Sequence, residues 1–211
     1  MTDLTRRAFL RAAGMTTASA VVLAACSDDR DGERADDDGT DGADGAAGAA
    51  DDVTTLRTAS SLEAAALGIY DTGIESGLVT TPQIREAVDL FRSEHEQHAE
   101  LFSGTTEDIG GEPFKGANPM LVGVDVLTDE RSVVQMLYEI EVALAQSYQG
   151  FVGSFDDESF NQVSMTVGGA EARHAAVLAG FLTIAPAQSA FQPTDAAIAS
   201  GEGLDAGGTV G

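Results

Sequence analysis

Four segments of the chain place hydrophobic residues at the three- and four-residue spacing of amphipathic helices. They cover residues 54–75, 82–104, 129–153 and 157–183. Gly77 ends the first segment, and Thr81 followed by Pro82 is typical of the start of the second. The pattern therefore predicts an all-α domain of four helices.

The lengths of the connections predict the topology of this domain. Only a few residues join the first helix to the second and the third to the fourth, which makes each pair an antiparallel hairpin. The connection from Gly104 to Thr128 is much longer and is expected to cross over along the bundle. We therefore expect a four-helix bundle over residues 53–185, with a long crossover between the second and third helices.

Each hydrophobic stripe is interrupted midway by residues of types that can bind metal ions. The interruptions are Glu63, His95 with His98, Glu141, and Glu171 with His174. Residues three apart project from one helix face, so such a pair can hold one ion or two adjacent ions from the same side. Burying these groups alone costs on the order of several kcal/mol, whereas divalent cations would compensate their charge. The sequence predicts a buried metal site.

The two predicted hairpins repeat one pattern. The matching segments are 62–70 with 140–148, both containing Glu-x6-Tyr, and 95–99 with 171–175. We interpret Tyr70 and Tyr148 as core aromatic residues, with a redox role as the alternative. Gly168 and Gly169 beside the last motif indicate a kink or a close helix contact.

The region from residue 53 to about 184 resembles the ferritin-like superfamily of carboxylate-bridged di-metal bundles. In that family, two helices supply one Glu each and the other two supply a Glu-x-x-His each. Glu63 and Glu141 match the single glutamates. Glu171 with His174 matches one of the two-residue motifs.

The other motif departs from the family pattern. His95 stands where a glutamate is expected, although His98 matches. Glu94, four residues before His98, is an alternative ligand. Glu139 is likewise a rival to Glu141 if the third helix is rotated. The departure leaves open the occupancy and redox character of one metal position.

Residues 1–26 have the pattern of an export signal. Arg6 and Arg7 precede an apolar run that is too short for a comfortable transmembrane helix. The arginine pair resembles a twin-arginine signal, and the Leu-Ala-Ala-Cys sequence that ends at Cys26 resembles a bacterial lipobox. We expect an exported protein that its lipidated cysteine holds on the outer face of the cytoplasmic membrane, in the cell envelope.

Charge and composition limit the partners. The net charge is -24, with 11 Lys and Arg against 35 Asp and Glu, which argues against nucleic acid as a partner. Residues 27–52 are almost wholly Asp, Gly and Ala, so we expect a disordered acidic linker. Residues 186–211 are expected to form an irregular tail, in which only Phe191 and Ile198 are suited to dock on the bundle.

The resemblance implies a di-iron or iron/manganese cofactor that reacts with dioxygen or peroxide. Ferroxidase, oxidase and peroxide-disproportionating proteins share these ligands, so the sequence assigns no single reaction and no catalytic residue. The alternative is a non-enzymatic envelope lipoprotein that keeps the bundle without an active metal site. A lipid anchor on a long linker suits a surface-held domain better than a closed cage that stores mineral.

Overall fold

The computed structural model of this chain describes residues 41–124, 126–185 and 196–205. Contacts divide the chain into Met1–Ala47 and a compact unit, Gly48–Gly211. The expected export signal, with Arg6, Arg7 and Cys26, lies outside the described residues, as do residues 27–40 of the expected linker and Phe191. The residues of the predicted metal site all belong to the compact unit.

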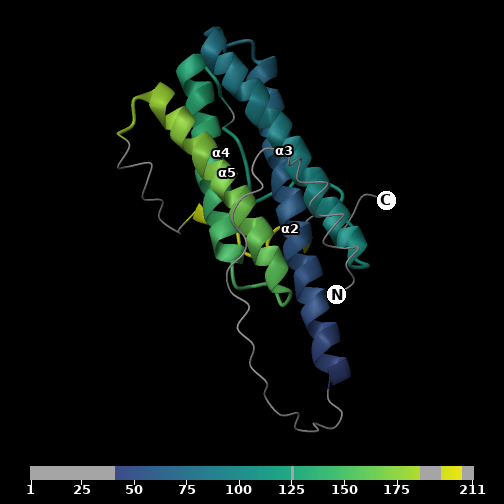
Figure 1. Ribbon diagram of the computed structural model, residues 1–211. Coiled ribbons are helices and arrows are strands. Elements are labelled where there is room, and N and C mark those ends of the chain that lie inside the picture. The colour runs from purple at the N-terminus through teal and green to yellow at the C-terminus, as the bar shows by residue number, and fades with distance from the viewer. Residues whose placement is uncertain (1–40, 125, 186–195, 206–211) are drawn as a thin grey trace, which may run out of the picture. The chain divides into compact units, whose positions relative to one another are not determined.

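Four helices make up the described helical part of the fold (Figure 1). They are α2 (Asp41–Glu75), α3 (Pro82–Asp108), α4 (Glu130–Phe151) and α5 (Glu158–Leu182). Figure 1 shows α2 beside α3 and α4 beside α5, each pair joined by a short connection. The long connection lies between α3 and α4. The predicted all-α four-helix bundle with a crossover between the hairpins is confirmed.

Side chains at the helix starts explain where α4 and α5 begin. The Asp129 side chain accepts a hydrogen bond from the backbone N–H of Ser132, whose hydroxyl accepts one from the Asp129 N–H in return. Asp157 caps α5 in a similar way by accepting from the N–H of Ser159. Such caps satisfy amide groups that have no partner inside the helix.

The end of α3 lies beyond the predicted stop at Gly104. The helix continues to Asp108, and the chain turns instead at Gly110, whose φ is +83°. Phe102 and Thr106 are buried on the last turns, so packing of this face carries the helix past a glycine that costs about 1 kcal/mol. The turn signal was the pair of glycines six residues further on.

The start of α2 also differs from expectation. Residues 41–52 are helical, so the prediction of a disordered linker is wrong for this stretch. Alanine is the strongest helix former, whereas the prediction of disorder rested on the lack of large apolar side chains. Asp52 is buried and accepts hydrogen bonds from the backbone N–H groups of Asp156 and Asp157, at 2.8 and 3.2 Å. This contact ties the early part of α2 to the start of α5.

Two irregular segments dock on the bundle. In the crossover, the N–H of Asn118 donates to the carbonyl of Ser61 at 2.8 Å. In the C-terminal tail, Ile198 is buried, and its N–H donates to the hydroxyl of Ser147 at 2.8 Å. Residues 186–195, which precede this part of the tail, are not among those described. None of the helices in the described ranges combines the length and hydropathy needed to cross a membrane.

Candidate metal centre

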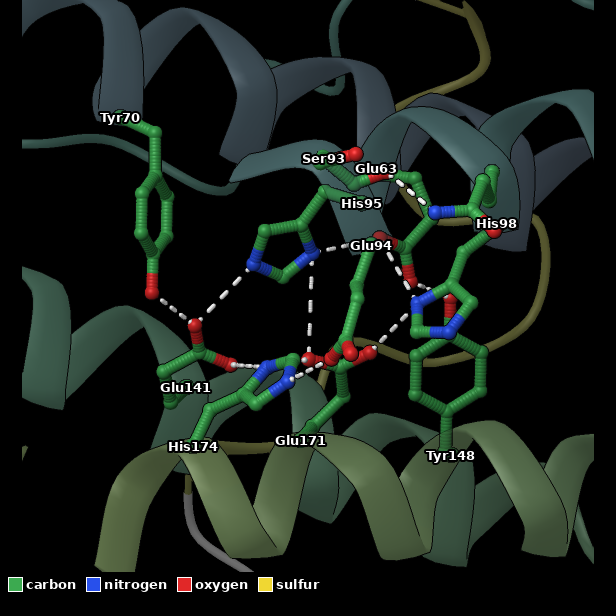
Figure 2. Close-up of polar contacts among 11 residues, drawn as sticks. Glu63, Tyr70, Ser93, Glu94, His95, His98, Glu141, Tyr148, Glu171 and His174 are labelled. Carbon is green, nitrogen blue, oxygen red and sulfur yellow. Dashed lines mark hydrogen bonds and ion pairs between the residues drawn. The ribbon is translucent and has the colours of Figure 1, made fainter. Parts of the chain in front are cut away.

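The side chains that interrupt the four hydrophobic stripes meet inside the bundle (Figure 2). They are Glu63 from α2, His95 and His98 from α3, Glu141 from α4, and Glu171 and His174 from α5. His98 is 16% exposed at its side chain, whereas each of the other five is at most 3% exposed. The structure therefore brings together six of the seven predicted ligands, and the seventh, Glu94, belongs to neither group described below.

These residues form two overlapping groups of four. One is Glu63, His95, His98 and Glu171, and the other is His95, Glu141, Glu171 and His174. Within each group, one ligand atom from every member lies within 4.8 Å of the others. His95 and Glu171 belong to both groups. The arrangement thus has two adjacent positions with two shared residues between them.

Glu171 presents a different oxygen to each position. Its Oε1 lies 2.8 Å from Nδ1 of His98, and its Oε2 lies 3.1 Å from Nδ1 of His174. The second carboxylate of each position comes from another helix, with Glu63 of α2 near His98 and Glu141 of α4 near His174. Nδ1 of His174 is 3.5 Å from Oε2 of Glu141. Each position therefore has one carboxylate of its own and one imidazole of its own.

His95 lies between the two single glutamates. Its Nδ1 is 2.8 Å from Oε2 of Glu63, and its Nε2 is 3.0 Å from Oε1 of Glu141. The ring is fully buried, so both contacts are made away from water. The sequence left the ligand choice between His95 and Glu94 open, and the structure places the His95 ring inside both groups.

Glu94 lies on the outer side of His174 instead. Its Oε2 is 2.6 Å from Nε2 of His174, whereas Glu171 contacts the other ring nitrogen, Nδ1. The Glu94 side chain is 36% exposed and belongs to neither group of four. A carboxylate in this position fixes the ring orientation and keeps the proton on Nε2, so that Nδ1 is the nitrogen that faces the centre.

Several buried polar atoms of the cluster have no hydrogen-bond partner. They are Nδ1 of His98, Oε2 of Glu141 and Oε1 of Glu171. Nδ1 of His98 and Oε1 of Glu171 are close to each other, but they are not aligned for a hydrogen bond. Buried polar atoms are nearly always satisfied in native proteins, so atoms like these call for a partner. Imidazole nitrogens and carboxylate oxygens facing one space are suited to divalent transition-metal ions, and the residues present fit such a cofactor.

Glu139, the rival of Glu141, does not reach the cluster. It is exposed on α4, and its Oε1 accepts a hydrogen bond from Gln135 at 2.8 Å. Glu141 is fully buried, so α4 has the rotation that the hydrophobic stripe predicted.

The two tyrosines of the repeat bind the glutamates of the opposite hairpin. The Tyr70 hydroxyl donates to Oε1 of Glu141, and the Tyr148 hydroxyl donates to Oε1 of Glu63. Both rings are fully buried, as expected of core aromatic residues, and their hydroxyls also fix the positions of two carboxylates of the cluster. The sequence analysis missed these contacts. The equal Glu-x6-Tyr spacing was the available signal.

Burial and close contacts shift the titration of the cluster. Burial raises the pKa of Glu63, but the hydrogen bond with His95 and the charges of His95 and His98 outweigh burial and lower the pKa to about 2. Burial and the charge of Glu63 raise the pKa of Glu171 above its ordinary value. Burial opposes protonation of His95, but the charges of Glu141 and Glu171 raise its pKa well above its ordinary value. In the absence of metal, protons on the imidazoles offset the charge of the carboxylates.

Comparison with known families identifies the fold. A family model described as a ferritin-like domain matches residues 51–183, which is more than half of the chain and includes both groups of four. Searches of curated proteins and of solved structures gave no match. Together with the four-helix architecture and its buried carboxylate and imidazole groups, the match shows that the chain belongs to the family of ferritin-like domains.

Proposed function

We propose that this chain is an exported ferritin-like protein that binds a dinuclear centre of iron, or of iron and manganese, for a redox reaction with dioxygen or peroxide. The observation that carries the proposal is the pair of overlapping groups, with ligand atoms within 4.8 Å of one another in each. Buried atoms without hydrogen-bond partners in both groups support it further.

The residues divide naturally between two metal positions. Glu63 and His98 would hold one ion, Glu141 and His174 would hold the other, and Glu171 would contribute one oxygen to each. When bound, the ions would supply the electron transfer to dioxygen or peroxide, which no side chain of the cluster provides.

The chain itself orients these ligands and keeps water away from them. The tyrosine hydroxyls fix one oxygen of Glu63 and one of Glu141. The ring of Phe91 stacks on His174, with 4.0 Å between the ring centroids. His98 and Glu94 are the more exposed members of this region, and both lie on α3. Small reactants would therefore approach along the α3 side of the centre.

A second candidate is a non-enzymatic bundle that holds no metal. One observation favours it: both ring nitrogens of His95 lie at hydrogen-bond distance from carboxylates, on Glu63 and Glu141. Such pairing satisfies part of the cluster without a cation. The two candidates differ in metal content and in the consumption of oxygen or peroxide when Fe2+ is supplied.

Metal analysis tests the proposal directly. The full chain, purified without a chelating tag and reconstituted with Fe2+ or Mn2+, is expected to retain two ions per chain. Glu171→Ala and His98→Ala should lose bound metal, whereas Glu139→Ala should retain it because Glu139 is exposed and outside the cluster. Less than about half an equivalent of metal in the unaltered chain, or equal retention in all three variants, would contradict the metal centre.

Export and lipid anchoring are part of the same proposal and rest on the sequence alone. Arg6 and Arg7 would direct export, and Cys26 would carry the lipid. Cys26→Ser should move the protein from the membrane fraction to the soluble fraction, and replacing Arg6 and Arg7 by Lys should retain it inside the cell. Unchanged fractionation of Cys26→Ser would contradict lipidation.

A further inference from the structure

His95 departs from the carboxylate pattern but takes the same geometric place as its counterpart in the repeat. Glu171, the equivalent residue of the other hairpin, turns one oxygen toward each metal position. His95 does the same with its nitrogens, because Nδ1 faces Glu63 and Nε2 faces Glu141. Both residues are fully buried, and both belong to the two groups of four. His95 is therefore placed to contribute to both metal positions, and its role is not limited to packing in the core.

This placement changes the donor atoms at both positions. With His95 included, each position has two carboxylate oxygens and two imidazole nitrogens from its group of four. A glutamate at residue 95 would give three carboxylates and one imidazole. Imidazole suits iron, zinc and copper, whereas carboxylate-rich sites suit manganese and magnesium. The exchange of one shared ligand thus alters the preference of both positions at once.

Resting on the proposed dinuclear centre, we propose that His95 is a shared metal ligand, bound to one position through Nδ1 and to the other through Nε2, and that it favours Fe2+ over Mn2+.

Charge compensation agrees with this arrangement. An imidazole that binds through both nitrogens has released both ring protons to the solvent and carries one negative charge. Together with Glu63, Glu141 and Glu171 it matches the charge of two divalent ions. Glu94 is not required for this balance, which agrees with its position on the outer side of His174.

A competition experiment tests the preference. The metal-free full chain is equilibrated without oxygen in equal concentrations of Fe2+ and Mn2+, and the bound ions are counted by elemental analysis. The unaltered chain is expected to bind mostly iron, and His95→Glu should lower its iron-to-manganese ratio several-fold while still binding two ions. Glu139→Gln, on the exposed face of α4, is the matched control and should keep the original ratio.

X-ray absorption on the iron-loaded, unaltered chain tests the ligand without a mutation. A shared His95 gives two imidazoles per iron on average, whereas His98 and His174 alone give one. One imidazole per iron, or an iron-to-manganese ratio that His95→Glu leaves unchanged, would overturn the role of His95 and leave the dinuclear centre standing. One ion per chain, rising to two in His95→Glu, would also overturn it, because His95 would then fill a metal position. No metal in either protein would instead reject the proposed function.

Discussion

The hydroxyl of Tyr70 donates a hydrogen bond to Glu141, a fully buried residue of the other hairpin. The same carboxylate oxygen is 3.0 Å from Nε2 of His95, so the tyrosine helps to fix both the glutamate and its imidazole partner. In the same way, the hydroxyl of Tyr148 in the second hairpin donates to Glu63 in the first. These hydrogen bonds join the hairpins through the centre of the bundle.

Tyr70→Phe should therefore destabilise the metal-free protein. The variant keeps the ring but removes a buried hydrogen bond to a charged group, at a cost of about 1.5–3 kcal/mol. Urea unfolding followed by circular dichroism measures the change. Tyr138→Phe on α4 is the control, because Tyr138 is only half-buried and is not part of the cluster. Equal stability of Tyr70→Phe and the unaltered protein would contradict the role given to this hydroxyl.

Glu94→Gln should weaken metal binding without changing the number of ions bound. The glutamine removes the negative charge that holds the outer nitrogen of His174, so the ring loses its fixed orientation. Loss of such an outer partner lowers metal affinity by about 10–100-fold. Competition with a chelator measures the affinity, and Glu100→Gln on the exposed face of α3 provides the comparison. If Glu94→Gln instead lost one ion outright, Glu94 would be a direct ligand.

Metal binding should release protons at neutral pH. Burial lowers the pKa values of His98 and His174, but the neighbouring glutamates outweigh it and raise them to about 9 and about 10. Both imidazoles are thus protonated at pH 7 in the metal-free protein, and the proton on each Nδ1 must leave before a metal binds there. A pH indicator in weak buffer should record this release, and metal affinity should rise with pH until these groups are deprotonated. Binding without proton release would contradict the assignment.

The same shifts predict how the metal-free protein responds to alkali. A pKa raised on folding stabilises the protein below the ordinary value of 6.5, and this contribution is lost as pH rises through the folded value of about 9 for His98. The melting temperature of the metal-free protein should therefore fall from pH 7 to pH 10. The metal-loaded protein should lack this part of the loss, because its imidazoles are already deprotonated at the metal. Parallel curves for the two forms would contradict this explanation.

Gly168 and Gly169 should respond in opposite ways to alanine. A Cβ on Gly168 would lie 2.7 Å from Cβ of Tyr148, so Gly168→Ala forces α4 and α5 apart at a cost of about 1–3 kcal/mol. At Gly169 the nearest atom is Nη1 of Arg173, 3.9 Å away, and alanine there should stabilise the helix by about 0.5–1 kcal/mol. Urea unfolding of the two variants compares them directly. Similar free energies of unfolding for the two variants would show that the added Cβ at Gly168 does not disturb the packing of α4 against α5.

Much of the fold and site could be predicted because both depend on helical period. A polar residue within a hydrophobic stripe must face the core, which placed Glu141 correctly and left Glu139 outside. The predicted close helix contact beside Glu171 is found at Gly168, and α5 continues through it without interruption. The short connections between α2 and α3 and between α4 and α5 likewise allowed the two antiparallel hairpins to be predicted.

Other features depend on distances that no spacing along one helix reveals. Glu94 is off the stripe of α3, and only the packing of α3 against α5 shows that it reaches the far nitrogen of His174. The partners of Tyr70 and Tyr148 lie on the opposite hairpin. The matching Glu-x6-Tyr spacing indicated that tyrosine and glutamate are related, but it did not show that each tyrosine pairs with the glutamate of the other hairpin. The end of α3 was misplaced because tertiary packing outweighed the propensity of Gly104.

The crossed tyrosine–glutamate pairs have a consequence for the integrity of the chain. A cut in the crossover would leave one fragment with Tyr70 but without its acceptor, and another with Tyr148 in the same condition. Neither fragment could form the cluster alone, but each would carry the glutamate that accepts from the tyrosine of the other. Mixing the two fragments is therefore expected to restore the tyrosine–glutamate hydrogen bonds that cleavage of the crossover separates.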